Sequence, residues 1–82
     1  MDRLQRLYRK ATGDRVTPTG AISAEVAKLP ERQRQIIEWR VEGYLLREIS
    51  ELDGGAHAAT LSTYIRRIFE EIRDAIATQP SK

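Results

Sequence analysis

The side chains that most often carry catalysis are sparse in this chain of 82 residues. It has one histidine, His57, no cysteine, and scattered serines and threonines. These give no set of nucleophile, base and orienting group. The neighbouring Glu70 and Glu71 would point about 100° apart on a helix, and neither glycine-rich phosphate-loop pattern occurs. We therefore expect no enzyme activity, no bound metal and no cofactor.

Arginine carries most of the remaining polar chemistry. The chain has 14 Lys and Arg against 12 Asp and Glu, a formal net charge of +2. Residues 1–15 alone have a net charge of +3, which leaves −1 for the rest of the chain; their cations are Arg3, Arg6, Arg9, Lys10 and Arg15. A guanidinium group suits planar contacts with phosphate, guanine or carboxylate, although arginine is also an ordinary surface residue.

Helices must position these side chains, because apolar residues recur at helical spacing throughout. A first helix is predicted over residues 2–11, with Asp2 as its N-cap. Two glycines and a proline then break the pattern. Thr17 is predicted to cap a short helix over residues 23–28, with Pro18 at the first helical position.

The second half of the chain predicts three more helices. Pro30 begins one, and Gly43 ends it as a residue that accepts positive φ. A two-turn helix follows, and the last helix begins at Ala56 or Thr60. The apolar stripes of these three helices are Ile36, Ile37, Val41 and Tyr44; Leu45, Leu46, Ile49 and Leu52; and Leu61, Tyr64, Ile65, Ile68, Ile72, Ala75 and Ile76.

We therefore predict an all-α fold of four to five helices. Residues 1–28 form a basic N-terminal helix, a linker and a short helix; residues 29–77 form a helix-turn-helix; and residues 78–82 form a disordered tail. No apolar run is long enough to span a membrane or to serve as a signal peptide, so a cytoplasmic protein is expected. Two short helices followed by a longer one, joined by tight turns, match the helix-turn-helix pattern.

The stretch LPERQRQIIEWRVEGYLLREISEL, residues 29–52, resembles region 4, the C-terminal promoter-binding domain of bacterial sigma factors. The matching residues are Leu29, Pro30, Glu31, Arg32, Gln33, Arg34, Glu42, Gly43, Glu48, Ile49, Ser50 and Glu51. TLSTYIRRIFEEIRDAI resembles the recognition helix of that family, with Thr60, Leu61, Arg67, Ile72, Arg73, Ala75 and Ile76 in register. LuxR-type response-regulator domains share the helix order but begin with Thr-Pro-Arg-Glu.

The resemblance implies a promoter-binding module and assigns roles by register. Phosphates would be neutralised by Arg66, Arg67, Arg32, Arg34 and Lys28, and base edges would be faced by His57, Ala58, Ala59, Ser62 and Thr63. The turn DGGAHAAT departs from the family, since it is one residue longer and lacks the usual buried aliphatic residue. The base-facing positions also lack the Arg, Gln or Asn that make bidentate base contacts.

Each assignment has a plainer alternative. Arg66 and Arg67 could pair with carboxylates of Glu70, Glu71 or Glu31, and the other cations and His57 could be solvated surface. Trp39 is expected to pack in part against the core or to contact a partner. The basic first helix is expected to add contacts to the DNA backbone or to mediate self-association, with Arg6 and Arg9 as its partner-binding residues.

The leading interpretation is a small DNA-binding transcriptional regulator whose partners are double-stranded DNA and RNA polymerase or another transcription protein. It would form a homodimer or rely on polymerase for affinity. The alternative is a protein-binding regulator, such as an antiactivator or a phage or mobile-element factor, that docks on polymerase or a transcription factor without reading DNA.

Overall fold

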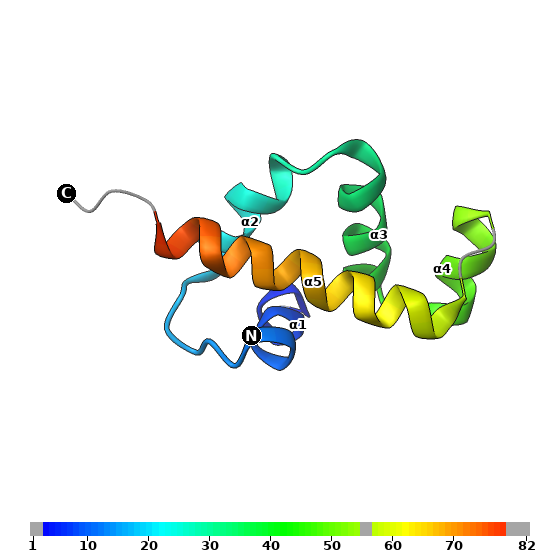
Figure 1. The fold of residues 1–82 in the computed structure, drawn as a ribbon, viewed down its shortest axis with the longest axis horizontal. Helices are drawn as coiled ribbons and strands as arrows, with labels where there is room; N and C mark the ends of the chain where they lie inside the picture. Colours follow the sequence, from blue (N-terminus) through cyan, green and yellow to red (C-terminus); the bar gives the residue numbers. More distant parts are fainter. Residues whose placement is uncertain (1–2, 55–56, 79–82) are drawn as a thin grey trace.

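The computed structural model describes residues 3–54 and 57–78, which form five helices and no strand. The helices are α1 (Arg3–Thr12), α2 (Thr19–Ala27), α3 (Glu31–Glu42), α4 (Leu46–Asp53) and α5 (Ala58–Ala77) (Figure 1). The all-α prediction of four to five helices is confirmed. Asp2, Ala56 and most of the tail predicted over residues 78–82 lie outside the described residues, and Thr78 is the C-cap of α5.

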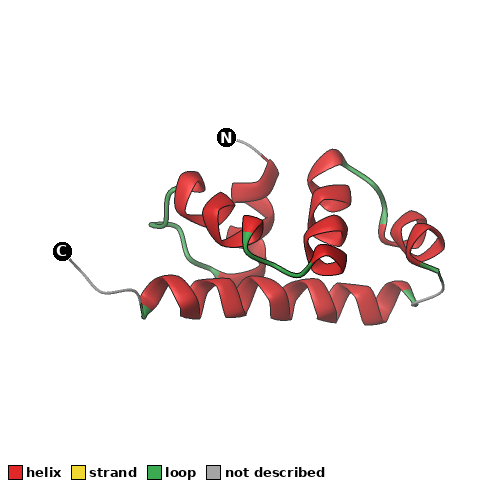
Figure 2. Cartoon of the chain, turned by 90° about the horizontal axis from the view of Figure 1, so that it is seen from above, coloured by secondary structure: helices red, strands yellow, loops and turns green. Residues whose placement is uncertain are grey.

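The longest helix, α5, runs along the length of the molecule and contacts each of the other four. The first two helices lie beside its middle and C-terminal half, whereas α3 and α4 lie beside its N-terminal half (Figure 1). Figure 2 shows the other four helices on one side of α5, so its opposite side is uncovered. In the described part of the chain, no helix has the length and apolar character needed to cross a membrane.

A single hydrophobic core takes side chains from all five helices. Its buried members are Tyr8, Ile22, Val26, Ile36, Ile37, Ile49, Leu61, Ile65, Ile68, Phe69 and Ile72. Helices shorter than about 12–15 residues are marginal alone, so these shared contacts must stabilise α1 to α4. The predicted stripe of the last helix is confirmed at Leu61, Ile65, Ile68 and Ile72, and Phe69 completes it.

Three helix boundaries follow from residues with restricted or unusual backbone angles. Gly43 ends α3 at φ +103°, as predicted, and Gly54 ends α4 at φ +97°. The predicted start of the second helix is wrong. Helix α2 begins at Thr19 because Pro18 has extended angles and is itself the N-cap.

The last helix begins at Ala58 with His57 as its N-cap, and not at Ala56 or Thr60.

Three apolar residues that were predicted to face the core are exposed instead. Tyr44 is 38% exposed, Leu45 50% and Leu52 53%. Gly43 ends α3 with left-handed backbone angles, so Tyr44 leaves the helical register of α3. Leu45 is the N-cap residue of α4 and has extended backbone angles, so it precedes the apolar stripe of that helix. Helix α4 lies at one end of the molecule, where α3 and α5 are its neighbours, and only Ile49 of that helix is fully enclosed.

The segment between α1 and α2 is organised around one carboxylate. Asp14 accepts hydrogen bonds from the Tyr8 hydroxyl at 2.7 Å, from the backbone N–H groups of Val16 at 2.9 Å and Thr17 at 3.2 Å, and from the Thr17 hydroxyl. The bonds from the Thr17 and Tyr8 hydroxyls hold the pKa of Asp14 well below its ordinary value. Burial and the neighbouring carboxylate raise the pKa of Tyr8. This cluster joins the loop to α1.

Candidate nucleic-acid interface

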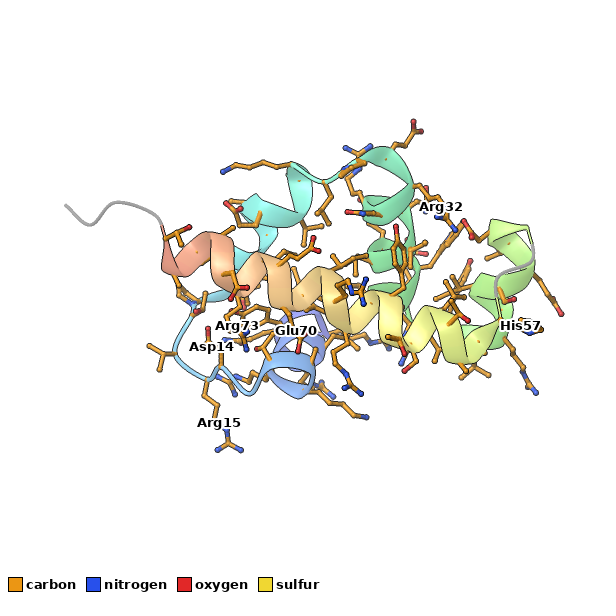
Figure 3. The ribbon with its side chains drawn as sticks, in the orientation of Figure 1. Asp14, Arg15, Arg32, His57, Glu70 and Arg73 are labelled. Atoms are coloured by element: carbon orange, nitrogen blue, oxygen red, sulfur yellow. The ribbon has the colours of Figure 1, made fainter. Side chains whose placement is uncertain are left out.

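The uncovered side of α5 carries different charges in its two halves. The N-terminal half contains two arginines and no acid, whereas the residues from Glu70 onward include Glu70, Glu71 and Asp74 with one arginine. Figure 3 shows Glu70 and Arg73 along the C-terminal half of the helix and His57 at the opposite end of the molecule. A polyanion would therefore be attracted to the first half of α5 and repelled from the second.

Arg66 and Arg67 are both exposed on this cationic half. Within residues 3–54 and 57–78 neither side chain forms a hydrogen bond or an ion pair. The alternative pairing with Glu70, Glu71 or Glu31 is not formed. Both guanidinium groups are thus available to an external anion.

The side chains expected to face base edges lie at the same end of α5. Ser62 and Thr63 are exposed, and the Thr63 hydroxyl approaches the Ala59 carbonyl at 3.4 Å. His57 is exposed as the N-cap residue, but its side chain makes no capping hydrogen bond. Ala59 is exposed and Ala58 half-buried. The exposed surface therefore offers hydroxyls, an imidazole and a methyl group.

Arg32, by contrast, is engaged within the fold. Its Nε and Nη2 donate to the two carboxylate oxygens of Asp53 at 3.1 and 2.7 Å, and its guanidinium lies 5.6 Å from the centroid of the Tyr64 ring. Figure 3 shows Arg32 in the space between α3 and α4. The hydrogen bonds to Asp53 raise the pKa of Arg32, and those from Arg32 lower the pKa of Asp53. Arg32 thus ties α3 to α4 and α5, and its charge is already offset.

The remaining predicted residues are dispersed. Lys28 is exposed at the C-cap of α2 and pairs with Glu25 at 2.9 Å, a surface pair of small energetic weight. Arg34 is half-buried on α3. On α1, Arg6 is exposed and Arg9 half-buried. Trp39 is half-buried and packs against the core, as the packing interpretation expected.

Two cations that the site prediction left out lie beside Arg66. Lys10 of α1 and Arg40 of α3 line the same hollow as Ser62 and Arg66 of α5. The concentration of positive charge in the first helix was visible in the sequence, but nothing local indicated that Lys10 would meet Arg40 and Arg66. Lys10, Arg40 and Arg66 bring positive charge from three helices to one flank of α5.

Comparisons with known proteins identify no relative. No family model matches the chain, and no curated protein and no solved structure is significantly similar to it.

Proposed function

We propose that this protein is a small DNA-binding transcriptional regulator whose α5 enters the major groove by its N-terminal half. One observation carries the proposal: that half is uncovered, and its Arg66 and Arg67 are exposed without an ion pair in the described part of the chain. The resemblance of the helix order and residues to sigma region 4 points to the same surface.

The charge pattern of α5 sets how the helix would meet a duplex. The major groove is about 12 Å wide and admits an α-helix. Residues 58–67 would extend about 15 Å along the helix axis, and the positive end of the helix dipole lies at this terminus. Glu70, Glu71 and Asp74 would be repelled by phosphates, so the C-terminal half would tilt away from the duplex.

Within the groove, the residues would divide into two roles. His57, Ser62 and Thr63 would face base edges, with Ala59 placed to contact a thymine methyl group. Arg66 and Arg67 would contact phosphates. Because none of the base-facing residues can make a bidentate base contact worth about 1–3 kcal/mol, phosphate attraction would dominate the affinity. A dimer or an RNA polymerase partner would then supply further affinity and site selection.

A second candidate function rests on the outer surface of α3 and α4. Leu45 and Leu52 are at least half exposed, and Leu52 lines one hollow together with Trp39 and the Arg32–Asp53 pair. Exposed aliphatic and aromatic side chains are typical of protein-binding surfaces. A regulator that docks on RNA polymerase or a transcription factor through this surface, without reading DNA, would use them.

Titration of a fluorescent duplex at several salt concentrations tests the leading proposal. The logarithm of affinity should fall linearly with the logarithm of salt concentration. Arg67→Ala should reduce that slope by about 0.9, the effect of one lost phosphate contact. Arg15→Ala is the matched control, because Arg15 is exposed in the loop before α2 and points away from the body of the molecule (Figure 3). Absence of binding at low salt, or equal slopes for Arg67→Ala and wild type, would overturn the proposal.

A further inference from the structure

A hollow of about 280 Å³ opens where α1, α3, α4 and α5 meet. Apolar side chains from α1, α4 and α5 contribute to its lining, and the polar lining residues are Lys10, Arg40, Ser62 and Arg66. None of the residues that line it is acidic. The hollow therefore concentrates three positive charges beside apolar walls. Such an arrangement makes the local electrostatic potential more positive and attracts anions.

Its three cations are presented from separate helices. The Nη1 group of Arg40 donates to the Tyr44 carbonyl at 2.7 Å, which fixes the guanidinium at the C-terminal end of α3. Lys10 lies in the last turn of α1, and Arg66 lies on α5. Neither Lys10 nor Arg66 has an ion-pair partner among the residues that the structure describes. Like charges that converge without a counterion repel one another, so an anion held between them would relieve that repulsion.

We propose that this hollow binds a phosphate group, which in the protein–DNA complex is a backbone phosphodiester beside the groove that α5 enters. Assigning the phosphate to DNA rests on the function proposed above. Phosphate fits because its several acceptor oxygens can receive an arginine fork and an ammonium group at once.

The position of the hollow on α5 implies that Arg66 and Arg67 would contact different DNA strands. Arg66 and Arg67 are adjacent on α5, so their side chains diverge by about 100° around the helix axis. Arg66 lines the hollow, whereas Arg67 lines the opposite flank with Thr60 and Tyr64. The two strands that border one major groove would thus be contacted from opposite flanks of α5, and α1 would contribute directly to the interface through Lys10.

Lys10→Gln tests the phosphate site in the hollow separately from DNA binding by α5, because DNA binding by α5 is tested with Arg67→Ala. In the duplex titration, Lys10→Gln should reduce the salt slope by at most about 0.9 and weaken binding by at most about eightfold at 0.1 M salt, because Arg40 and Arg66 remain beside the same phosphate. Arg15→Gln removes the same charge from an exposed loop position and should leave the slope unchanged. Lys10 is exposed, so its replacement by glutamine leaves the core intact.

Titration of the ¹⁵N-labelled wild type with inorganic phosphate provides a second arm that does not depend on DNA. Amide shifts at Lys10, Arg40 and Arg66 that disappear in Lys10→Gln would support the site even if no duplex binds, and would then indicate a free phosphate compound as the ligand. If the wild type binds duplex but Lys10→Gln and Arg15→Gln have equal slopes, the hollow is not a phosphate site, although the α5 proposal stands. If neither duplex nor phosphate binds, both proposals fail.

Discussion

Tyr8 is the buried side chain that α1 contributes to the core, beside the partly buried Leu4, Leu7 and Ala11. Two substitutions of Tyr8 separate the contribution of its ring from that of its hydroxyl. The ring is fully buried and meets Phe69 edge-on at 6.1 Å between centroids. The hydroxyl donates to Asp14 at 2.7 Å. If Lys10 is to reach the interface, α1 must be held in place by these contacts.

The structure predicts different losses in the free energy of unfolding for Tyr8→Phe and Tyr8→Ala. Tyr8→Phe removes one hydrogen bond to a carboxylate that keeps three other donors, so we expect a loss of about 1.5 kcal/mol in the free energy of unfolding. That corresponds to a drop in Tm of about 6–12 °C for a domain of this size. Tyr8→Ala also removes the ring, at about 3–5 kcal/mol. The whole domain has only about 4–12 kcal/mol, so this variant should lose a large share of its stability and unfold at a much lower temperature than wild type.

Thermal and urea unfolding followed by circular dichroism measure both changes, with Tyr44 as the matched control. Tyr44 is partly exposed, and its hydroxyl forms no hydrogen bond within the described residues. Tyr44→Phe should be close to neutral, and Tyr44→Ala should cost much less than Tyr8→Ala. If Tyr8→Ala unfolds at the same temperature as Tyr44→Ala, α1 does not share the core, and the placement of Lys10 beside α5 is wrong.

Three further predictions concern turns and charges. In urea unfolding, Gly43→Ala should lower the free energy of unfolding by more than about 1 kcal/mol, because φ is +103° there. Gly20→Ala should raise it by about 0.4–1 kcal/mol, because Gly20 lies within α2 and no atom is near the added methyl group. Equal effects of the two substitutions would contradict the backbone conformations assigned to these glycines. Arg32→Gln should lower Tm less in an Asp53→Asn background than in wild type, since the pair is already broken there, and additivity of the two changes would show that the pair is uncoupled. The depressed pKa of Asp14 means that its contribution to stability is present above about pH 4 and is lost as the pH falls further; Asp14→Asn should therefore flatten the dependence of Tm on pH below that value, and an unchanged acid profile would refute this role.

Local features of the sequence predicted much of the fold. The stripe containing Leu61, Ile65, Ile68 and Ile72 has a period close to 3.6, which identifies both the helix and its buried side. Gly43 could be placed at a helix end because the left-handed conformation strongly favours glycine. Such signals depend on neighbouring residues and need no knowledge of tertiary packing.

Features that depend on distant residues were not predictable. Arg32 and Asp53 are 21 positions apart, so the sequence did not indicate that a predicted phosphate contact would be engaged in an internal ion pair. Leu45 and Leu52 fit a helical stripe, yet α4 lies at the end of the molecule with too few neighbours to cover them.

The hollow beside α5 likewise required the structure. Lys10, Arg40 and Arg66 belong to three helices, and only their packing brings the three side chains to one place. The sequence placed Arg66 and Arg67 beside one another on the last helix, but it did not show that they would line opposite flanks of it.

Mapping a bound duplex onto α5 by amide chemical shifts tests the central claim most directly. Addition of duplex DNA to ¹⁵N-labelled protein at low salt should shift the amides of residues 58–67 strongly, while those of residues 70–77 should change little because Glu70, Glu71 and Asp74 repel phosphate. Shifts confined to the outer surface of α3 and α4, or to the acidic half of α5, would contradict the account.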